Sequence, residues 1–221
     1  MSFPRRVEAV VFDMDGLLLD TETVYRAAMI EAAGTFGVTF TGADYAAMVG
    51  KTNPESAVLL THWYGDDFPV RAFFERVWID VEMLLEAETR LKTGVVEILD
   101  YLDDVGLPRG IATSNGIASV EKYLGRFDLL HRFHAVVANA DVTRHKPHPD
   151  PYLEAARRIG VDPGRCLALE DSHPGVRAAH AAGMMTVMVP DILDPTEEMH
   201  EKCIHIADSL HVVLDLLKAS V

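Results

Sequence analysis

The stretch Val7-Glu8-Ala9-Val10-Val11-Phe12, followed directly by Asp13-Met14-Asp15-Gly16, decides the fold of this chain. The first segment is almost continuously apolar, which is typical of a strand that is covered on both faces in a parallel sheet. In open α/β sheets, ligands bind outside the carboxyl ends of such strands, so both aspartates are expected at a ligand crevice. Gly16 lets the backbone turn sharply beside a ligand.

The pair Asp13 and Asp15 indicates phosphoryl-transfer chemistry. Two nearby carboxylates are costly to ionise together unless a divalent cation neutralises them, so one can attack while the other moves protons. Asp13 lies nearest the strand end and is the candidate nucleophile, and Asp15 is the candidate general acid and base. The alternative is an acidic turn that caps a helix, and an isolated Asp-x-Asp-Gly turn does not separate the two interpretations.

Composition narrows the class of protein. The chain has 221 residues, 49% hydrophobic and 24% charged, as in an ordinary globular protein with room for a second small domain. Its formal net charge of -14 argues against a nucleic-acid partner, because that binding depends on clustered Lys and Arg. No apolar run approaches the length of a membrane span, so a cytoplasmic location without a membrane partner is expected.

Short apolar runs alternate with helical stretches, which favours βα units and an α/β fold with a parallel sheet. The predicted strands are Val7–Phe12, Arg109–Ala112, Ala135–Ala138, Cys166–Leu169 and Thr186–Val189. About ninety residues separate the first two, far more than one crossover needs. This interval looks helical almost throughout, so residues 21–90 are predicted to be a helical cap, and residues 1–20 with 91–221 the α/β core.

Three further segments follow predicted strands and strengthen the interpretation of the first. Thr113-Ser114-Asn115 offers a hydroxyl and backbone donors for phosphoryl oxygens. Lys146 could set an ammonium against phosphate and the Asp13 carboxylate, and Glu170-Asp171 supplies hard oxygen ligands that suit Mg²⁺. Each segment also has an ordinary explanation, as a polar turn, a solvated lysine or a helix N-cap. Their arrival at one sheet edge favours a common site.

In this order, the four segments resemble the haloacid dehalogenase-like superfamily of phosphohydrolases over the whole chain. Asp13-Met14-Asp15-Gly16 is similar to its first motif, Thr113 to the second, Lys146 to the third and Glu170-Asp171 to the fourth. The helical interval resembles the cap of the subgroup that includes β-phosphoglucomutase and many small phosphatases. The resemblance implies a doubly wound, Rossmann-like parallel sheet with an inserted α-helical cap domain.

The resemblance also implies roles for these residues. Asp13 would form an aspartyl-phosphate, Asp15 would serve as acid and base, and Thr113 and Lys146 would hold the transferring group. Mg²⁺ would be bound by the Asp13 carboxylate, the Asp15 carbonyl and Asp171, with Glu170 as a direct or water-mediated ligand. The residues expected to contact substrate are Gly16, Glu22, Lys51, Asn53, Ser114 and Asn115.

Three functions remain open. The preferred one is a Mg²⁺-dependent phosphatase of a small phosphorylated metabolite, either a sugar phosphate or a nucleotide-like monophosphate. The second is a phosphosugar mutase, which the resemblance disfavours because Asn53 and Gly116 stand where β-phosphoglucomutases have an Arg and a Lys, and Tyr25 replaces a His. The third is a catalytically silent metabolite-binding protein on the same scaffold. Substrate identity and oligomeric state cannot be read from the sequence.

The aromatic residues of the cap interval are expected to form its core. They are Trp63, Tyr64, Phe68, Phe73, Phe74 and Trp78. An exposed member of this set could instead stack on a substrate ring.

Overall fold

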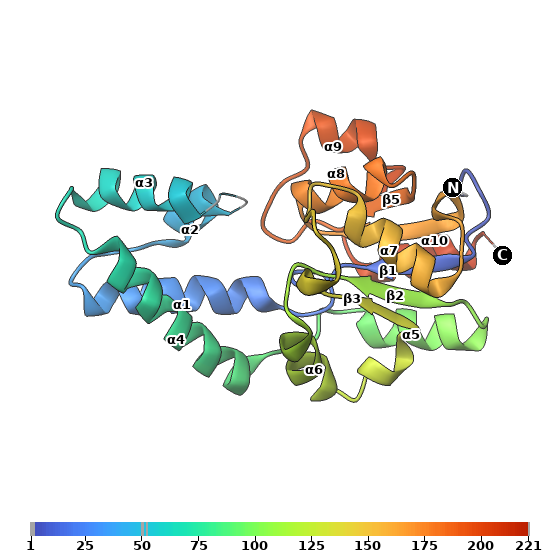
Figure 1. The fold of residues 1–221 in the computed structure, drawn as a ribbon, viewed down its shortest axis with the longest axis horizontal. Helices are drawn as coiled ribbons and strands as arrows, with labels where there is room; N and C mark the ends of the chain where they lie inside the picture. The colour runs from blue at the N-terminus through green and yellow to red at the C-terminus, as the bar shows by residue number, and fades with distance from the viewer. Residues whose placement is uncertain (1–2, 50, 52, 221) are drawn as a thin grey trace. The chain divides into compact units, whose positions relative to one another are not determined.

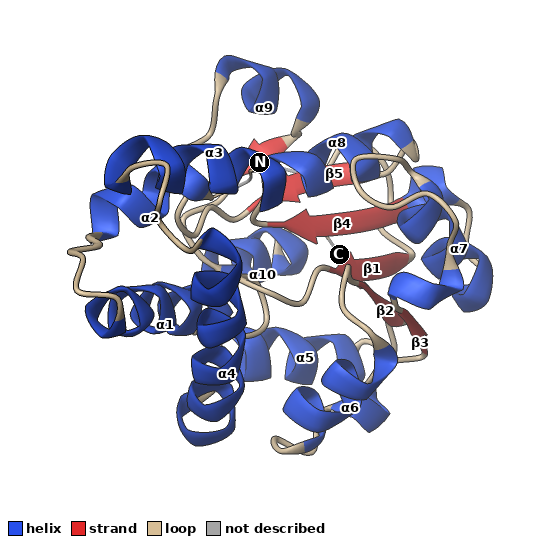
Figure 2. Cartoon of the chain, turned by 60° about the vertical axis from the view of Figure 1, so that its left-hand side comes forward, coloured by secondary structure: helices blue, strands red, loops and turns tan. Residues whose placement is uncertain are grey.

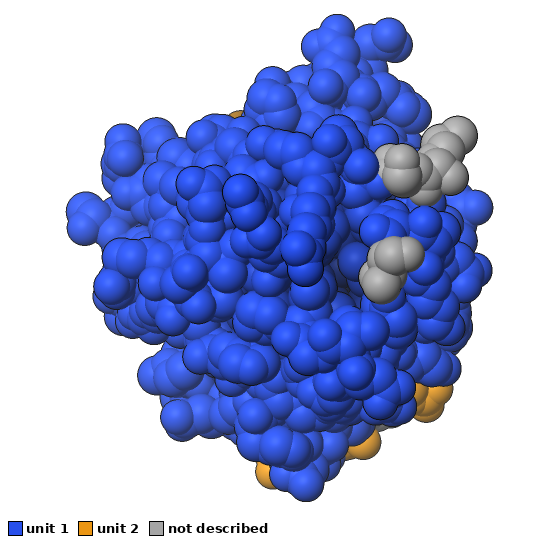
Figure 3. Space-filling view, turned by 90° about the vertical axis from the view of Figure 1, so that its right-hand side faces the viewer, with its two compact units in different colours: residues 1–19, 91–221 blue, residues 20–90 orange. Residues whose placement is uncertain are grey.

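The computed structural model describes residues 3–49, 51 and 53–220. The chain divides into two compact units, which Figure 3 distinguishes by colour. Residues 1–19 and 91–221 form one unit, called the core below, and residues 20–90 form the other, called the helical unit. Within the described residues, no helix combines the length and the apolar character that crossing a membrane would require.

The core is built on a six-stranded parallel sheet of order β3-β2-β1-β4-β5-β6. Its strands, coloured red in Figure 2, are β1 (Ala9–Phe12), β2 (Arg109–Ala112), β3 (Ala135–Val137), β4 (Cys166–Glu170), β5 (Met185–Met188) and β6 (His205–Ile206). The α/β fold expected from the sequence is confirmed. The prediction missed β6, a two-residue edge strand beside β5 that lacks the apolar run by which the others are recognised.

Helices lie on both faces of this sheet (Figures 1 and 2). They are α5 (Val95–Asp104), α6 (Ile117–Gly125), α7 (Asp150–Ile159), α8 (His173–Ala181), α9 (Glu197–Lys202) and α10 (Leu210–Lys218). Helix α7 packs against β1, β2 and β3, and α8 packs against β4 and β5, while α5 and α10 pack against each other. Two layers of helices therefore cover the sheet, which is why its strands are apolar on both faces.

Strand β1 shows how the sequence specifies this arrangement. Ala9 and Val11 pack in a buried cluster with Tyr152 and Ala155 of α7. Phe12 is equally buried and meets Phe133 edge to face, with ring centroids 6.0 Å apart. Both sets of alternating side chains are therefore removed from water, as the continuous apolar run predicts.

The helical unit consists of α1 (Thr21–Thr35), α2 (Gly42–Met48), α3 (Asn53–Tyr64) and α4 (Val70–Glu88). Phe73 is fully buried at its centre, and its ring contacts those of Phe36, Phe40 and Phe68. Trp78 differs from the expected aromatic core, because 56% of its surface is exposed. It lies on α4 one position after the buried Val77, so the helical period turns it outward.

Candidate active site

Parallel pairing brings the residues that follow three neighbouring strands to one edge of the sheet. Beyond β1, the Asp13 N–H donates to the Leu169 carbonyl at 3.0 Å. Beyond β2, the Thr113 N–H donates to the Val137 carbonyl, also at 3.0 Å. Because these bonds continue the ladder past the strand ends, the backbone around Asp13 and Thr113 is as firmly fixed as the sheet itself.

Lys146 contacts two carboxylates, Asp13 directly after β1 and Glu170 at the end of β4. Its Nζ contacts Asp13 Oδ1 and lies 2.5 Å from Glu170 Oε1. All three side chains are almost fully buried, and Glu170 is completely so. Buried charges are tolerated when they are paired and hydrogen-bonded, and here the lysine stabilises the charged form of each acid while both acids stabilise the charged lysine.

The electrostatics of the site follow from burial and crowding. Burial raises the pKa of Asp13 to about 7, Lys146 opposes this rise, and the carboxylates of Glu170 and Asp15 add to it. Burial also lowers the pKa of Lys146, but Asp13 and Glu170 outweigh this effect, so the lysine pKa lies above its ordinary value. Lys146 is therefore a permanent cation. An added divalent cation would favour the ionised form of Asp13.

Glu170 is held from several sides. Tyr152 Oη donates to its Oε1 at 2.6 Å, and the Ser172 N–H and Oγ donate to its Oε2 at 3.2 and 2.9 Å. Gly175 makes room for this carboxylate, because a Cβ at that position would overlap it. Both oxygens of Glu170 thus already accept hydrogen bonds.

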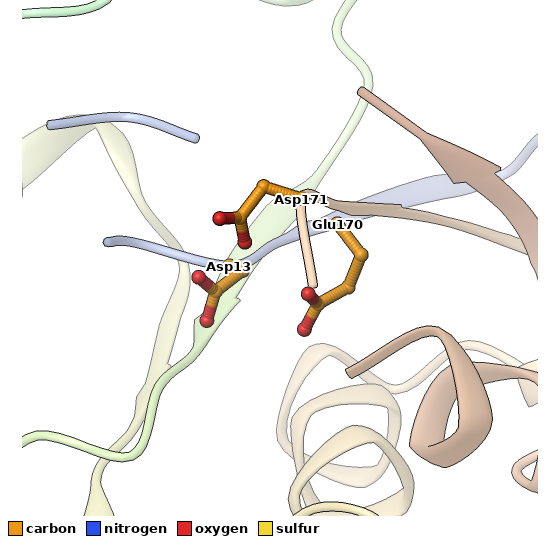
Figure 4. Close-up of side chains that lie close together, drawn as sticks. All are labelled: Asp13, Glu170 and Asp171. Carbon is orange, nitrogen blue, oxygen red and sulfur yellow. The ribbon is translucent and has the colours of Figure 1, made fainter. Parts of the chain in front are cut away.

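Three carboxylates form a possible cation site. Each of Asp13, Glu170 and Asp171 offers an oxygen, and these atoms lie within 4.8 Å of one another (Figure 4). Gly16 has φ +73° and lies so close to Asp171 Oδ2 that a Cβ would overlap it. An all-oxygen, anionic set of this kind fits Mg²⁺. Within this set, Glu170 also accepts hydrogen bonds from Tyr152 and Ser172, and Asp13 contacts Lys146.

Asp15 is held by a residue from the neighbouring strand end. Asn115 Nδ2 donates to Asp15 Oδ2 at 2.5 Å, and the Asn115 N–H donates to Thr113 Oγ1 at 3.1 Å. Asn115 is an expected substrate contact, and in this structure its side-chain amide also orients the carboxylate of Asp15, the predicted acid and base. Thr113 itself is buried, with 2% of its surface exposed.

Two other expected substrate contacts have internal partners. The Gly16 N–H donates to the Leu19 carbonyl at 2.9 Å, and the Ser114 carbonyl accepts from Asn139 Nδ2 at 3.1 Å. The Gly16 amide is therefore already hydrogen-bonded within the turn, and the lack of a side chain at Gly16 leaves room for the Asp171 carboxylate.

The remaining expected contacts belong to the helical unit. Glu22, Lys51 and Asn53 line a cavity of about 280 Å³ formed wholly within that unit. Its wall also includes Tyr25 and Trp78, whose rings meet edge to face at 6.2 Å. Tyr45 Oη donates to Glu22 Oε2 at 2.5 Å, which fixes this carboxylate at the cavity wall.

Tyr152 is a further polar residue of the site, to which none of the four motifs points. It shares the buried face of α7 with Ala155 and Ala156, and a hydroxyl on this otherwise apolar face is the sequence feature that could have indicated a buried polar contact. Ser172 was also missed, although it is both a donor to Glu170 and the N-cap of α8, with its side chain accepting from the Gly175 N–H.

Known proteins resemble this chain in sequence and in fold. The family model described as "Haloacid dehalogenase-like hydrolase" matches residues 10–189. Hexitol phosphatase B of Escherichia coli is 35% identical over 194 residues, covering 86% of each chain. A Drosophila melanogaster protein named as a probable pseudouridine-5'-phosphatase is 36% identical over 196 residues, covering 85% of this chain and 83% of that one.

A solved structure shares the fold as well. The crystal structure of CbbY from Rhodobacter sphaeroides in complex with phosphate superposes with a TM-score of 0.73 at 27% identity, covering 92% of this chain and 95% of that one. The superfamily predicted from the four motifs is therefore confirmed, and so is its class of phosphoric monoester hydrolases. The chain belongs to the haloacid dehalogenase-like hydrolase family.

Proposed function

We propose that this chain is a Mg²⁺-dependent phosphatase that hydrolyses a small phosphomonoester through an aspartyl-phosphate on Asp13. The observation that carries the proposal is the contact of Lys146 with both Asp13 and Glu170 at the strand ends, next to Asp171. This grouping combines a nucleophile, a fixed cation and oxygen ligands for a metal. Phosphoryl transfer is catalysed mainly by positioning and by neutralising charge on the transferring oxygens.

In the first step, an Asp13 carboxylate oxygen attacks phosphorus while the bond to the ester oxygen breaks. Asp15, protonated at this stage, gives its proton to the leaving alkoxide. Asn115 orients Asp15 through the 2.5 Å hydrogen bond to Oδ2. Lys146 and Thr113 stabilise the negative charge on the phosphoryl oxygens.

In the second step, Asp15 takes a proton from a water molecule whose oxygen attacks the same phosphorus. The bond between Asp13 and phosphorus breaks, which releases inorganic phosphate and returns both aspartates to their starting forms. The carboxylates of Asp13 and Asp171 and the carbonyl of Asp15 would hold Mg²⁺, which when bound would neutralise negative charge on the transferring group.

We propose further that residues 20–90 act as a cap that selects the substrate. The relatives named above are a hexitol phosphatase and a probable pseudouridine-5'-phosphatase, which favours a sugar phosphate or a nucleotide-like monophosphate here. The cavity beside Glu22 offers a carboxylate for hydroxyl groups and the rings of Tyr25 and Trp78 for an apolar surface. Such a mixture of polar and aromatic groups is typical of small-molecule sites.

A phosphosugar mutase is the competing activity. It must hold a second phosphate, which requires additional cations. Gly116 is the N-cap of α6 and offers no side chain for this purpose, and Asn53 is uncharged. Two missing charged hydrogen bonds would weaken such binding by about 3–6 kcal/mol, taking roughly 1.5–3 kcal/mol for each. Transfer of the phosphoryl group to water is therefore preferred.

A panel of phosphorylated metabolites with Mg²⁺ tests the proposal, with released phosphate as the readout. Hexose 1-phosphate with a bisphosphate activator is included, and its product is examined for an isomer. We expect inorganic phosphate from at least one sugar phosphate or nucleoside monophosphate. Isomer formation without phosphate would favour the mutase, and no product from any compound would favour a silent binding protein.

The covalent intermediate is tested separately. Turnover is quenched with acid, the acyl phosphate is reduced with borohydride, and the peptide containing residue 13 is analysed by mass spectrometry. We expect conversion of Asp13 to homoserine. Reduction at another carboxylate, or none under conditions of rapid turnover, would contradict the role of Asp13 as nucleophile.

A further inference from the structure

Tyr152 is a buried polar residue that the mechanism above does not use. It lies on α7, none of its surface is exposed, and its hydroxyl donates to Glu170 Oε1 at 2.6 Å. Its surroundings are apolar, since Ala9, Val11 and Ala155 share its cluster. A phenylalanine would fill the same space without a polar atom to satisfy, so the hydroxyl calls for an explanation in terms of the group it contacts.

The contact partner of Tyr152 is central to the site. Glu170 Oε1 accepts from both Tyr152 Oη and Lys146 Nζ, and the same ammonium contacts Asp13. Lys146 Nζ also lies 5.3 Å from the centre of the Tyr152 ring. Tyr152 therefore touches both members of the buried Lys146–Glu170 pair, one through its hydroxyl and the other through its ring.

We propose that Tyr152 is a positioning residue for the phosphatase reaction. Its hydroxyl fixes the orientation of the Glu170 carboxylate, and this carboxylate holds the Lys146 ammonium where it reaches Asp13 and the transferring phosphoryl group. The inference rests on the proposed function for its kinetic part, but its geometric part concerns only residues of this chain.

The physical reason is the sharing of one carboxylate oxygen. With two donors on Oε1, the ammonium is drawn only partly toward Glu170 and keeps its contact with Asp13. Without the phenol hydroxyl, Oε1 has one donor fewer, so the ammonium moves toward Glu170 and away from Asp13. Burial and the nearby Glu170 carboxylate raise the pKa of Tyr152 well above its ordinary value, so the phenol remains a proton donor throughout the working range.

The first test is Tyr152→Phe, which removes the hydroxyl and keeps the ring. We expect kcat to fall about tenfold for every substrate, as is usual when a residue that orients an active-site ligand is lost. KM should change by less than about threefold, because the ring and the substrate contacts remain. Tyr101→Phe is the matched control, since its hydroxyl donates to the Leu217 carbonyl at 3.5 Å, away from the charged cluster, and turnover should be unchanged.

The second test follows Lys146 directly, without Mg²⁺ and without substrate. Protein labelled with ¹⁵N at the lysine side chains should give a slowly exchanging ammonium signal for Lys146, assigned by its loss in Lys146→Arg. We expect this signal to shift or broaden in Tyr152→Phe and to stay unchanged in Tyr101→Phe. Circular dichroism establishes that each variant is folded.

The outcomes separate this inference from the proposed function. Unchanged kcat in folded Tyr152→Phe would overturn the positioning role, and so would a loss of kcat with an unchanged Lys146 signal. If the wild-type protein hydrolyses no phosphomonoester, the proposed function fails. The ammonium signal then still decides whether Tyr152 positions Lys146.

Discussion

The core and the helical unit each contain a candidate binding site, and the two sites are built differently. In the core, Asp13, Lys146 and Glu170 are almost fully buried and each contacts another charged group. In the helical unit, the cavity has aromatic and aliphatic walls, a single carboxylate hydrogen-bonded to Tyr45, and an exposed tryptophan. The core site is a buried network of contacting charges, whereas the cavity of the helical unit is partly open and largely apolar.

This difference indicates that the core site determines the reaction and the helical unit determines which substrates fit. A buried charged network tolerates little change, because losing one partner leaves another charge unpaired at a large cost. A partly exposed apolar wall tolerates substitution, and its shape determines which substrates fit. We therefore expect changes in the core to affect all substrates alike, and changes in the helical unit to affect substrates unequally.

The largest effect is expected for Asp13→Asn. Loss of the nucleophile should lower kcat by about a thousandfold or more for every substrate in the panel. Thermal unfolding should remain cooperative, because the amide is nearly the same size as the carboxylate. Turnover at more than a few per cent of wild type, in protein free of contaminating phosphatase, would contradict the role of Asp13 as the nucleophile for all substrates.

Removal of divalent cations should have the next largest effect. Chelation is expected to reduce turnover by about a hundredfold or more, since a bound metal stabilises transition-state charge by several kcal/mol. Mg²⁺ should restore activity, whereas sodium at matched ionic strength should not. Asp171→Asn should raise the Mg²⁺ concentration needed for half-maximal rate. Full activity in the presence of chelator would contradict the proposed dependence on Mg²⁺.

Gly175→Ala tests how little change the buried charged network of the core tolerates. The added Cβ would overlap the Glu170 carboxylate, so we expect a loss of about 1–3 kcal/mol in the free energy of unfolding. Turnover should fall for all substrates together, because Glu170 is displaced from Lys146. Gly125→Ala is the matched control, since Gly125 is exposed and, in the described part of the chain, no atom beyond its own helix backbone and chain neighbours lies within 4 Å of its added Cβ. Equal unfolding temperatures for the two variants would show that the Glu170 pocket is not tightly packed.

Trp78→Ala should have the smallest and most selective effect. Losing one wall of the cavity is expected to change KM by up to about tenfold for some substrates, equivalent to about 1.4 kcal/mol. The value of kcat for the smallest substrate should be retained. Ile79→Ala serves as the control, because Ile79 is similarly exposed on α4 and does not line the cavity. A uniform loss across the panel would contradict a role in selectivity.

Much of the core could be predicted because its signals are local. Strand β1 is a continuous apolar run, β2 ends in the apolar pair Ile111-Ala112, and β4 is apolar up to Glu170; polar residues follow each of these apolar segments. Parallel strands align their carboxyl ends, so Asp13, Thr113 and Glu170 could be placed together without coordinates. Strand β6 could not be predicted, because His205 and Ile206 become a strand only by pairing with β5.

The helical unit was less predictable in detail. Its helical character followed from periodicity, but the exposure of Trp78 depends on how α1 and α4 pack. In the core, the hydrogen bond of Tyr152 likewise depends on packing between separate elements. Its place in α7 predicts burial, yet only the approach of β4 reveals that its hydroxyl meets a carboxylate.

The sequence by itself determined the α/β fold, the family and the residue types at the strand ends, because all of these depend on local pattern and on the order of motifs along the chain. Only the tertiary structure decided which groups touch. It joins Asn115 to Asp15 across 100 positions and Tyr152 to Glu170 across 18. Hydrogen bonds and ion pairs depend on distances of a few ångströms between remote segments, and no spacing in the sequence specifies them.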